Sequence, residues 1–102
     1  MIVAILNHFK LGFGIEGIIR IKADIKAIHK VAEKLKAIDA LYFVARSMGA
    51  YDFDAEYYVK SSSELKELID TINAMHGVTD TDVTTVLDYV KERYDFGDLD
   101  VE

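Results

Sequence analysis

The residue types that could do chemistry gather in one short stretch, Met48-Gly49-Ala50-Tyr51-Asp52. A glycine that tolerates positive φ and an aspartate that bonds locally are typical of a tight turn. The same stretch also brings backbone N–H groups, a phenol and a carboxylate to one point. These groups suit a zwitterion, since N–H groups can bind its carboxylate and Asp52 its ammonium group. On composition alone, the plain turn is the preferred interpretation.

Three carboxylates, Asp52, Asp54 and Glu56, alternate along the chain and would point to one face of a strand. Carboxylates placed in this way could do acid–base work or bind a divalent cation. We favour cross-strand ion pairs of Arg20 and Arg46 with Asp54 and Glu56, which would set the register of a dimer rather than catalyse a reaction.

Other chemical signals are weak. No two of His8, His29 and His76 stand four residues apart, so no metal site is expected, and cysteine is absent. Residues 12–17 spell G-x-G-x-x-G, but they neither follow a parallel strand nor open a helix, which dinucleotide binding requires. The sequence therefore predicts no catalytic residue, no metal and no cofactor.

Size and charge narrow the function further. The 102 residues are enough for one domain. With 12 Lys and Arg against 18 Asp and Glu, the net charge of −6 disfavours binding to a phosphate backbone by this chain alone. There is no apolar run of membrane-spanning length and no signal peptide, so we expect a cytoplasmic protein without membrane contact.

Hydrophobic patterns predict the elements that position these groups. Asp24 is expected to cap a helix whose apolar stripe ends at Ile38. Ser61 and Glu64 fit a capping box for a second helix, which Gly77 ends. Strands are expected at residues 1–6, 15–23, 41–48, 53–60 and 79–90.

This order, a strand followed by βαββαβ, predicts an α+β fold of the ferredoxin-like kind with an extra N-terminal strand. Gly17, inside the second strand, would either weaken the strand or permit close packing against another backbone. The uncovered sheet face is expected to be half apolar, which predicts a homodimer formed through the sheet. Its apolar residues are expected to be Ile18, Val44, Tyr58 and Val86.

Three stretches together resemble a known family: Lys10-Leu11-Gly12-Phe13, the stretch 48–52, and Gly77-Val78 followed by Thr81-Asp82 and Val86-Leu87. In this order and spacing they are similar to the C-terminal effector (RAM) domain of Lrp/AsnC transcription regulators. The similarity spans about residues 2 to 93. It suggests a hinge strand and turn at 1–9, the RAM domain at 10–93 and an acidic tail at 94–102.

The resemblance implies a domain that dimerises through its sheet, often assembles further into octamers, and binds a small effector between subunits. The effector is usually an amino acid. Two family threonines are replaced here by Met48 and Val83, which makes the site more apolar and favours either an apolar amino acid or a loss of sensing. The effector-binding residues that the resemblance implies are Met48, Gly49, Ala50, Tyr51, Asp52 and Thr81.

Family regulators read DNA through an N-terminal helix-turn-helix. Only nine residues precede Lys10, so we expect this chain to lack that part and to act with full-length family members, as a fragment or as a natural stand-alone domain. Two alternatives stay open. One is a dimeric ferredoxin-like enzyme of the monooxygenase, isomerase or decarboxylase type, and the other is a purely structural oligomerisation module.

Overall fold

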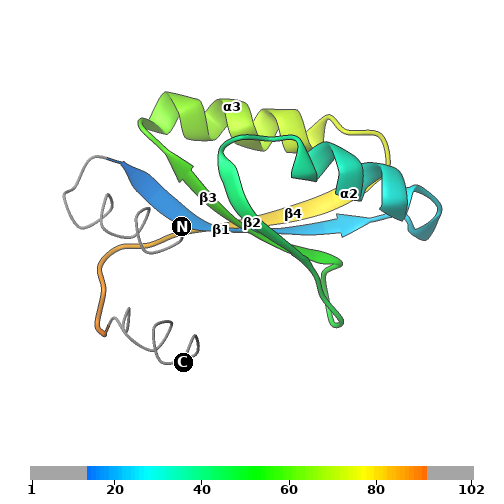
Figure 1. Cartoon of the computed structure of the whole chain (residues 1–102), viewed down its shortest axis with the longest axis horizontal. Coiled ribbons are helices and arrows are strands. Elements are labelled where there is room, and N and C mark those ends of the chain that lie inside the picture. Colours follow the sequence, from blue (N-terminus) through cyan, green and yellow to red (C-terminus); the bar gives the residue numbers. More distant parts are fainter. Residues whose placement is uncertain (1–13, 92–102) are drawn as a thin grey trace, which may run out of the picture.

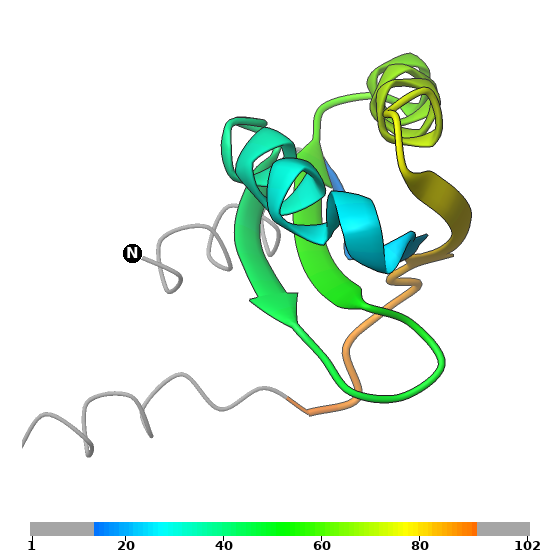
Figure 2. The ribbon, with the colours of Figure 1, turned by 90° about the vertical axis from the view of Figure 1, so that its right-hand side faces the viewer.

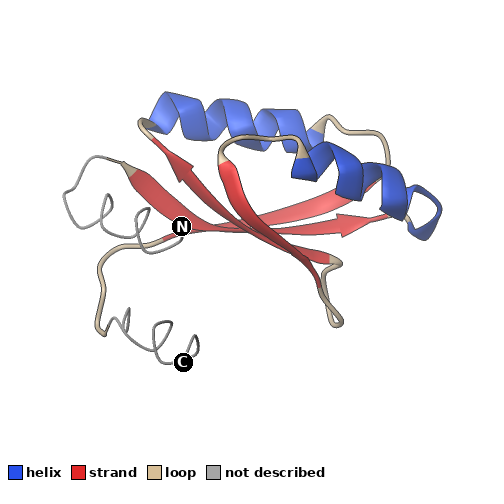
Figure 3. Ribbon diagram, viewed as in Figure 1, coloured by secondary structure: helices blue, strands red, loops and turns tan. Residues whose placement is uncertain are grey.

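A computed structural model describes residues 14–91, which form a four-stranded antiparallel sheet with helices along one face (Figures 1 and 3). The strand order β2-β3-β1-β4 is the ferredoxin-like arrangement predicted above. The expected hinge strand, the stretch 10–13, His8 and the acidic tail lie outside the described residues. The elements are β1 (Ile15–Ala23), η1 (Ile25–Ala27), α2 (Ile28–Lys36), β2 (Leu41–Arg46), β3 (Phe53–Val59), α3 (Ser62–Asn73) and β4 (Val78–Thr85).

The core lies between the sheet and the two α-helices. Alternate residues of β1 and β3 point into it, as the period of two in a strand requires. Figure 2 shows α2 and α3 over the same side of the strands, while the β2–β3 loop reaches away from the helices. The largest fully buried side chains are Tyr57, Phe53, Ile19, Ile21, Leu35, Ile72 and Val31.

Side chains cap both helical segments as predicted. The Asp24 carboxylate accepts a hydrogen bond from the Lys26 N–H at 3.0 Å, and a single 3-10 turn precedes α2. The Ser61 hydroxyl accepts from the Glu64 N–H at 3.2 Å, while the Glu64 carboxylate accepts from the Lys60 N–H at 2.9 Å. These caps satisfy N–H groups that have no partner inside the helix.

Gly77 has the predicted positive φ, at +96°, but α3 ends earlier, at Asn73. The glycine therefore belongs to the loop that leads into β4. A Cβ atom at this position would stand 2.3 Å from the Ala27 Cβ, so the loop also packs against the start of α2.

The fourth strand is shorter than predicted. It pairs with β1 as far as Gly17 opposite Thr85, and the Val86 N–H still donates to the Glu16 carbonyl at 2.9 Å. By this register Leu87 would stand opposite Ile15, the first residue of β1, and residues 88–90 would lie beyond the start of that strand. Residues 86–90 are therefore not a strand, although their composition is typical of one.

A bulge in β2 makes the set of residues on the open face differ from the predicted one. The register with β3 shifts between Leu41 and Phe43, which reverses the alternation of the residues that follow. Phe43 consequently stands opposite Glu56 on the open face, whereas Val44 packs against the core. The expectation for Val44 was wrong. Ile18 and Tyr58 do take strand positions on the open face, and Val86 follows the end of β4, bonded to Glu16; Ile18 and Val86 are each 37% exposed.

Candidate functional site

The loop that joins β2 and β3 has a well-defined shape. The Ser47 N–H donates to the Asp52 carbonyl at 2.9 Å and closes the loop, and the Ser47 hydroxyl donates to the Tyr51 carbonyl at 3.2 Å. Gly49 adopts φ +144°, a conformation that side chains disfavour. The sequence prediction of a turn at this position is thus confirmed, with glycine where the backbone needs it.

This loop and the adjoining strands enclose a shallow cavity of about 130 Å³, which we call the hairpin cavity. Four of the six predicted effector residues line it. Three further residues, from β1, β3 and the end of β2, were not predicted as effector contacts. The lining residues are Arg20, Ser47, Met48, Gly49, Ala50, Tyr51 and Asp54.

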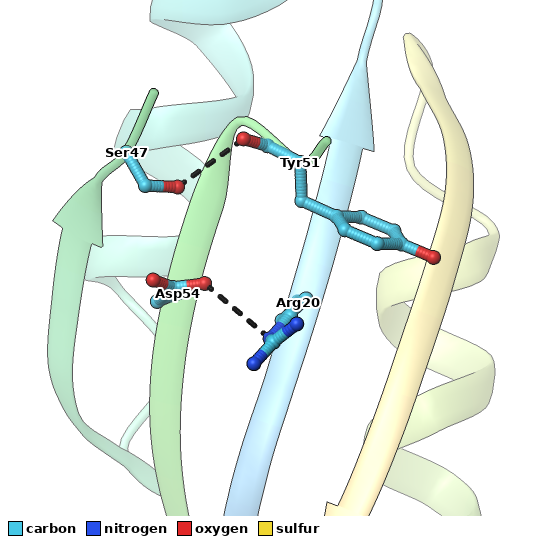
Figure 4. Close-up of polar contacts among 4 residues, drawn as sticks. All are labelled: Arg20, Ser47, Tyr51 and Asp54. Carbon is cyan, nitrogen blue, oxygen red and sulfur yellow. Dashed lines mark hydrogen bonds and ion pairs between the residues drawn. The ribbon is translucent and has the colours of Figure 1, made fainter. Parts of the chain in front are cut away.

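Tyr51 extends from the loop over β1 toward β4 (Figure 4). Its hydroxyl donates to the Asp80 carboxylate at 3.2 Å, so the ring bridges the open face of the sheet. Partial loss of hydration, followed by the nearby Asp80 and Asp82 carboxylates, raises the pKa of the Tyr51 hydroxyl above its usual value. The hydroxyl is therefore a neutral donor at physiological pH.

Arg20 and Asp54 face each other on neighbouring strands at the floor of the cavity (Figure 4). Their Nε and Oδ1 atoms lie 4.0 Å apart, and the two side chains are 55% and 46% exposed. This contact confirms the predicted cross-strand pair of Arg20 with Asp54. Arg46 instead lies over the Phe53 ring at 5.7 Å, because the β2 bulge places it opposite that residue.

Asp52 has a structural contact that the sequence did not reveal. Its carboxylate accepts from the Ala23 N–H at 2.8 Å, and its own N–H donates to the Ile21 carbonyl at 2.9 Å. Both bonds join the hairpin to the end of β1, where the pairing of β1 with β4 shifts register. Asp52 is not among the residues that line the hairpin cavity.

Thr81 lies apart from the other predicted effector residues. It stands opposite Ile21, a core residue, and its hydroxyl donates to the Asn73 side-chain oxygen of α3 at 2.8 Å. The structure therefore places Thr81 on the helix-covered side of the sheet. The alternation of β4 decides this, because Asp80 and Asp82 occupy the open-face positions beside it.

Replacing Asp52 by alanine is expected to lower the free energy of unfolding by roughly 1 to 3 kcal/mol, since a charged acceptor is lost and a part-buried N–H loses its partner. Asp52→Asn, which keeps an acceptor oxygen, should lose less than half as much. Urea denaturation of both variants measures the difference. Equal stability of Asp52→Ala and the unchanged chain would show that the bond to Ala23 contributes nothing.

A second polar cluster lies nearer the other end of the open face. The Tyr42 hydroxyl lies near two carboxylates, those of Glu56 and of Glu16, a residue only 8% exposed. Burial and these two carboxylates raise the pKa of Tyr42. Within residues 14–91, His29 and His76 are both exposed at helix or loop positions, and no three metal-ligating side chains stand close enough to share an ion.

None of the helices between residues 14 and 91 has the length and apolar character that crossing a bilayer requires.

Comparison with known proteins gives a consistent family match. The Lrp/AsnC ligand binding domain matches residues 16–96. An uncharacterized HTH-type transcriptional regulator of Pyrococcus furiosus, PF1231, is 32% identical over 90 residues, which make up 87% of this chain and 60% of that protein. The chain thus spans about 60% of the length of this curated relative.

Solved structures share the fold. AsnC of E. coli superposes with a TM-score of 0.74 at 22% identity, covering 83% of this chain and 58% of that one. The complex of the regulator NMB0573 with L-Met from Neisseria meningitidis also gives a TM-score of 0.74, at 18% identity, covering 84% and 58% of the two chains.

Proposed function

This chain belongs to the Lrp/AsnC ligand-binding domain family, and we propose that it binds an amino acid in the hairpin cavity. The observation that carries the proposal is the cavity itself. The hairpin, which family resemblance assigns to effector binding, closes with its own hydrogen bonds over a pocket whose floor carries one cation and one carboxylate. A pocket that is formed before binding loses little conformational entropy when a ligand enters.

Two observations support an amino acid with an apolar side chain. The Neisseria neighbour was solved as a complex with L-Met. In this chain the fully exposed Met48 lies at the cavity, where a flexible thioether can adapt to an apolar group.

The domain would act by changing how its copies assemble. We propose that two copies join through their open faces, and that an effector held between subunits favours one assembly over another because it binds the two with different affinity. The partners would be further copies of this chain or full-length regulators of the family, acting in the cytoplasm. The DNA-binding step would belong to the regulator.

We infer binding rather than catalysis, since the relatives are transcriptional regulators by name. The enzyme alternative predicted a histidine or polar cluster in a pocket of the sheet face. His29 and His76 lie elsewhere, whereas a polar cluster of Tyr42, Glu16 and Glu56 does line a pocket of the sheet face. An absorbance scan of the purified protein tests the haem-handling form of that alternative, because a Soret band would support it.

A thermal-shift screen against the twenty amino acids tests the proposed function. A ligand at 100 times its dissociation constant stabilises the fold by about 2.7 kcal/mol, which is readily visible as a higher Tm. We expect the clearest shifts from apolar amino acids. A flat panel at millimolar concentrations, in a protein that melts cooperatively, would contradict amino-acid binding.

A further inference from the structure

We infer that Arg20 and Asp54 recognise the two charges of a free α-amino acid, with Arg20 binding its carboxylate and Asp54 its ammonium group. The inference rests on the proposed function and adds to it the atoms that would select the ligand class. The inference assigns the contact with the ligand's ammonium group to Asp54 rather than Asp52, because the Asp52 carboxylate already accepts a hydrogen bond from the Ala23 N–H.

The contact between the two side chains is loose enough to admit a ligand. Their 4.0 Å separation exceeds the usual 2.7 to 2.9 Å of a charge-assisted hydrogen bond, and both groups are about half exposed. An exposed pair of this kind contributes only about 0 to 1 kcal/mol to stability. A zwitterion that enters between them replaces one weak contact with two complementary ones.

Charge around the cavity selects for both ligand charges together. Asp80 and Asp82 of β4 stand beside Lys22 and Arg20 on the open face. The carboxylates around the site, Asp54 included, would repel a ligand that carries only a carboxylate. A ligand that carries only an ammonium group would leave the Arg20 guanidinium without its planar, bidentate partner. The combination fits a molecule with one group of each sign.

The size of the cavity sets how the ligand lies. The cavity measures about 130 Å³, and we assign this space to the ammonium, Cα and carboxylate of an amino acid. The ligand side chain must then project past the rim. Met48 lies at that rim, fully exposed, so we assign it the contact that distinguishes one side chain from another.

The test compares Asp54→Asn and Arg20→Gln with a matched control, Asp70→Asn. Asp70 is an exposed carboxylate of α3 that pairs with Lys66 on the same helix, and it does not line the cavity. The probes are the twenty free L-amino acids, their N-acetyl derivatives and their amides. Thermal shift finds the binders, and isothermal titration calorimetry measures their dissociation constants.

We expect Asp54→Asn to weaken the binding of the free amino acid with the highest affinity by about 10- to 100-fold, the range for one charged hydrogen bond. The N-acetyl derivative lacks the ammonium group and should bind this variant no worse than the unchanged chain. Arg20→Gln should weaken the binding of the free amino acid to a similar extent but leave the affinity for its amide unchanged. Asp70→Asn should change affinity less than about twofold.

Three outcomes would overturn the inference. In the first, the variants bind the free amino acid with an affinity within twofold of that of the unchanged chain. In the second, they lose affinity equally for the free amino acid and for its N-acetyl and amide derivatives, which indicates a structural role. If no free amino acid binds the unchanged chain, the proposed function fails first and the inference with it. The Tm without ligand reports folding of each variant, and Arg20→Lys supplies a second, charge-retaining test at that position.

Discussion

Replacement of Gly17 by alanine is expected to cost about 3 kcal/mol or more of folding free energy. The added Cβ would stand 1.9 Å from the Thr84 carbonyl oxygen and 2.6 Å from the Tyr57 hydroxyl. That hydroxyl bonds to the Thr84 carbonyl at 3.2 Å and to the Thr85 hydroxyl at 2.8 Å, so both β4 and the buried ring must shift. Overpacking in a well-packed core typically costs 1 to 3 kcal/mol, occasionally more, and here hydrogen bonds break as well.

Thermal unfolding measures the effect. For a domain of this size, about 3 kcal/mol corresponds to a fall in Tm of roughly 12 to 24 °C. Gly14→Ala is the matched control: its Cβ would meet the end of the Tyr58 side chain and no backbone atom, and a side-chain end shifts at lower cost than a strand. A Gly17→Ala variant as stable as Gly14→Ala would mean that the sheet accommodates the methyl group by a small strand shift.

Changing Ile18 to aspartate is expected to separate the predicted dimer into folded monomers. Ile18 is 37% exposed at the middle of β1, between Glu56 and Thr84, and Phe43 and Val86 expose similar fractions on the same face. We predict that a second copy covers this surface. A charge placed there would be buried without a partner and would also repel Glu56, which disfavours the dimer strongly.

Light scattering at micromolar concentration gives the mass directly. The unchanged chain should measure at least twice 11.5 kDa, and Ile18→Asp should measure 11.5 kDa with an intact circular dichroism spectrum. Ile25→Asp introduces the same change on the helical side, at a residue 73% exposed, and should keep the larger mass. A monomeric unchanged chain would remove the assembly step from the proposed function.

The predictions that held rest on patterns within a few residues of one another. The period of two along β1 and β3 separated the core face from the open face, and Asp24 and Ser61 identified the helix starts. Of the two roles predicted for Gly17, the structure shows the close backbone approach, and β4 is that backbone. These features depend on local sterics and hydrogen bonding, so the sequence alone determines them, and with them the ferredoxin-like fold.

The composition of the site depended on contacts between distant segments. A single bulge in β2 moved Val44 inward and placed Arg46 over Phe53. The Asp52 carboxylate accepts a hydrogen bond at the end of β1, and the Thr81 hydroxyl donates one to a side chain of α3. Sequence identifies which side chains can bind a zwitterion. The sequence also predicted that Arg20 pairs with Asp54, but not that the pair lies beneath the hairpin. Only the register of three strands decides which side chains are already engaged, because cross-strand partners are set by packing between segments far apart in the chain.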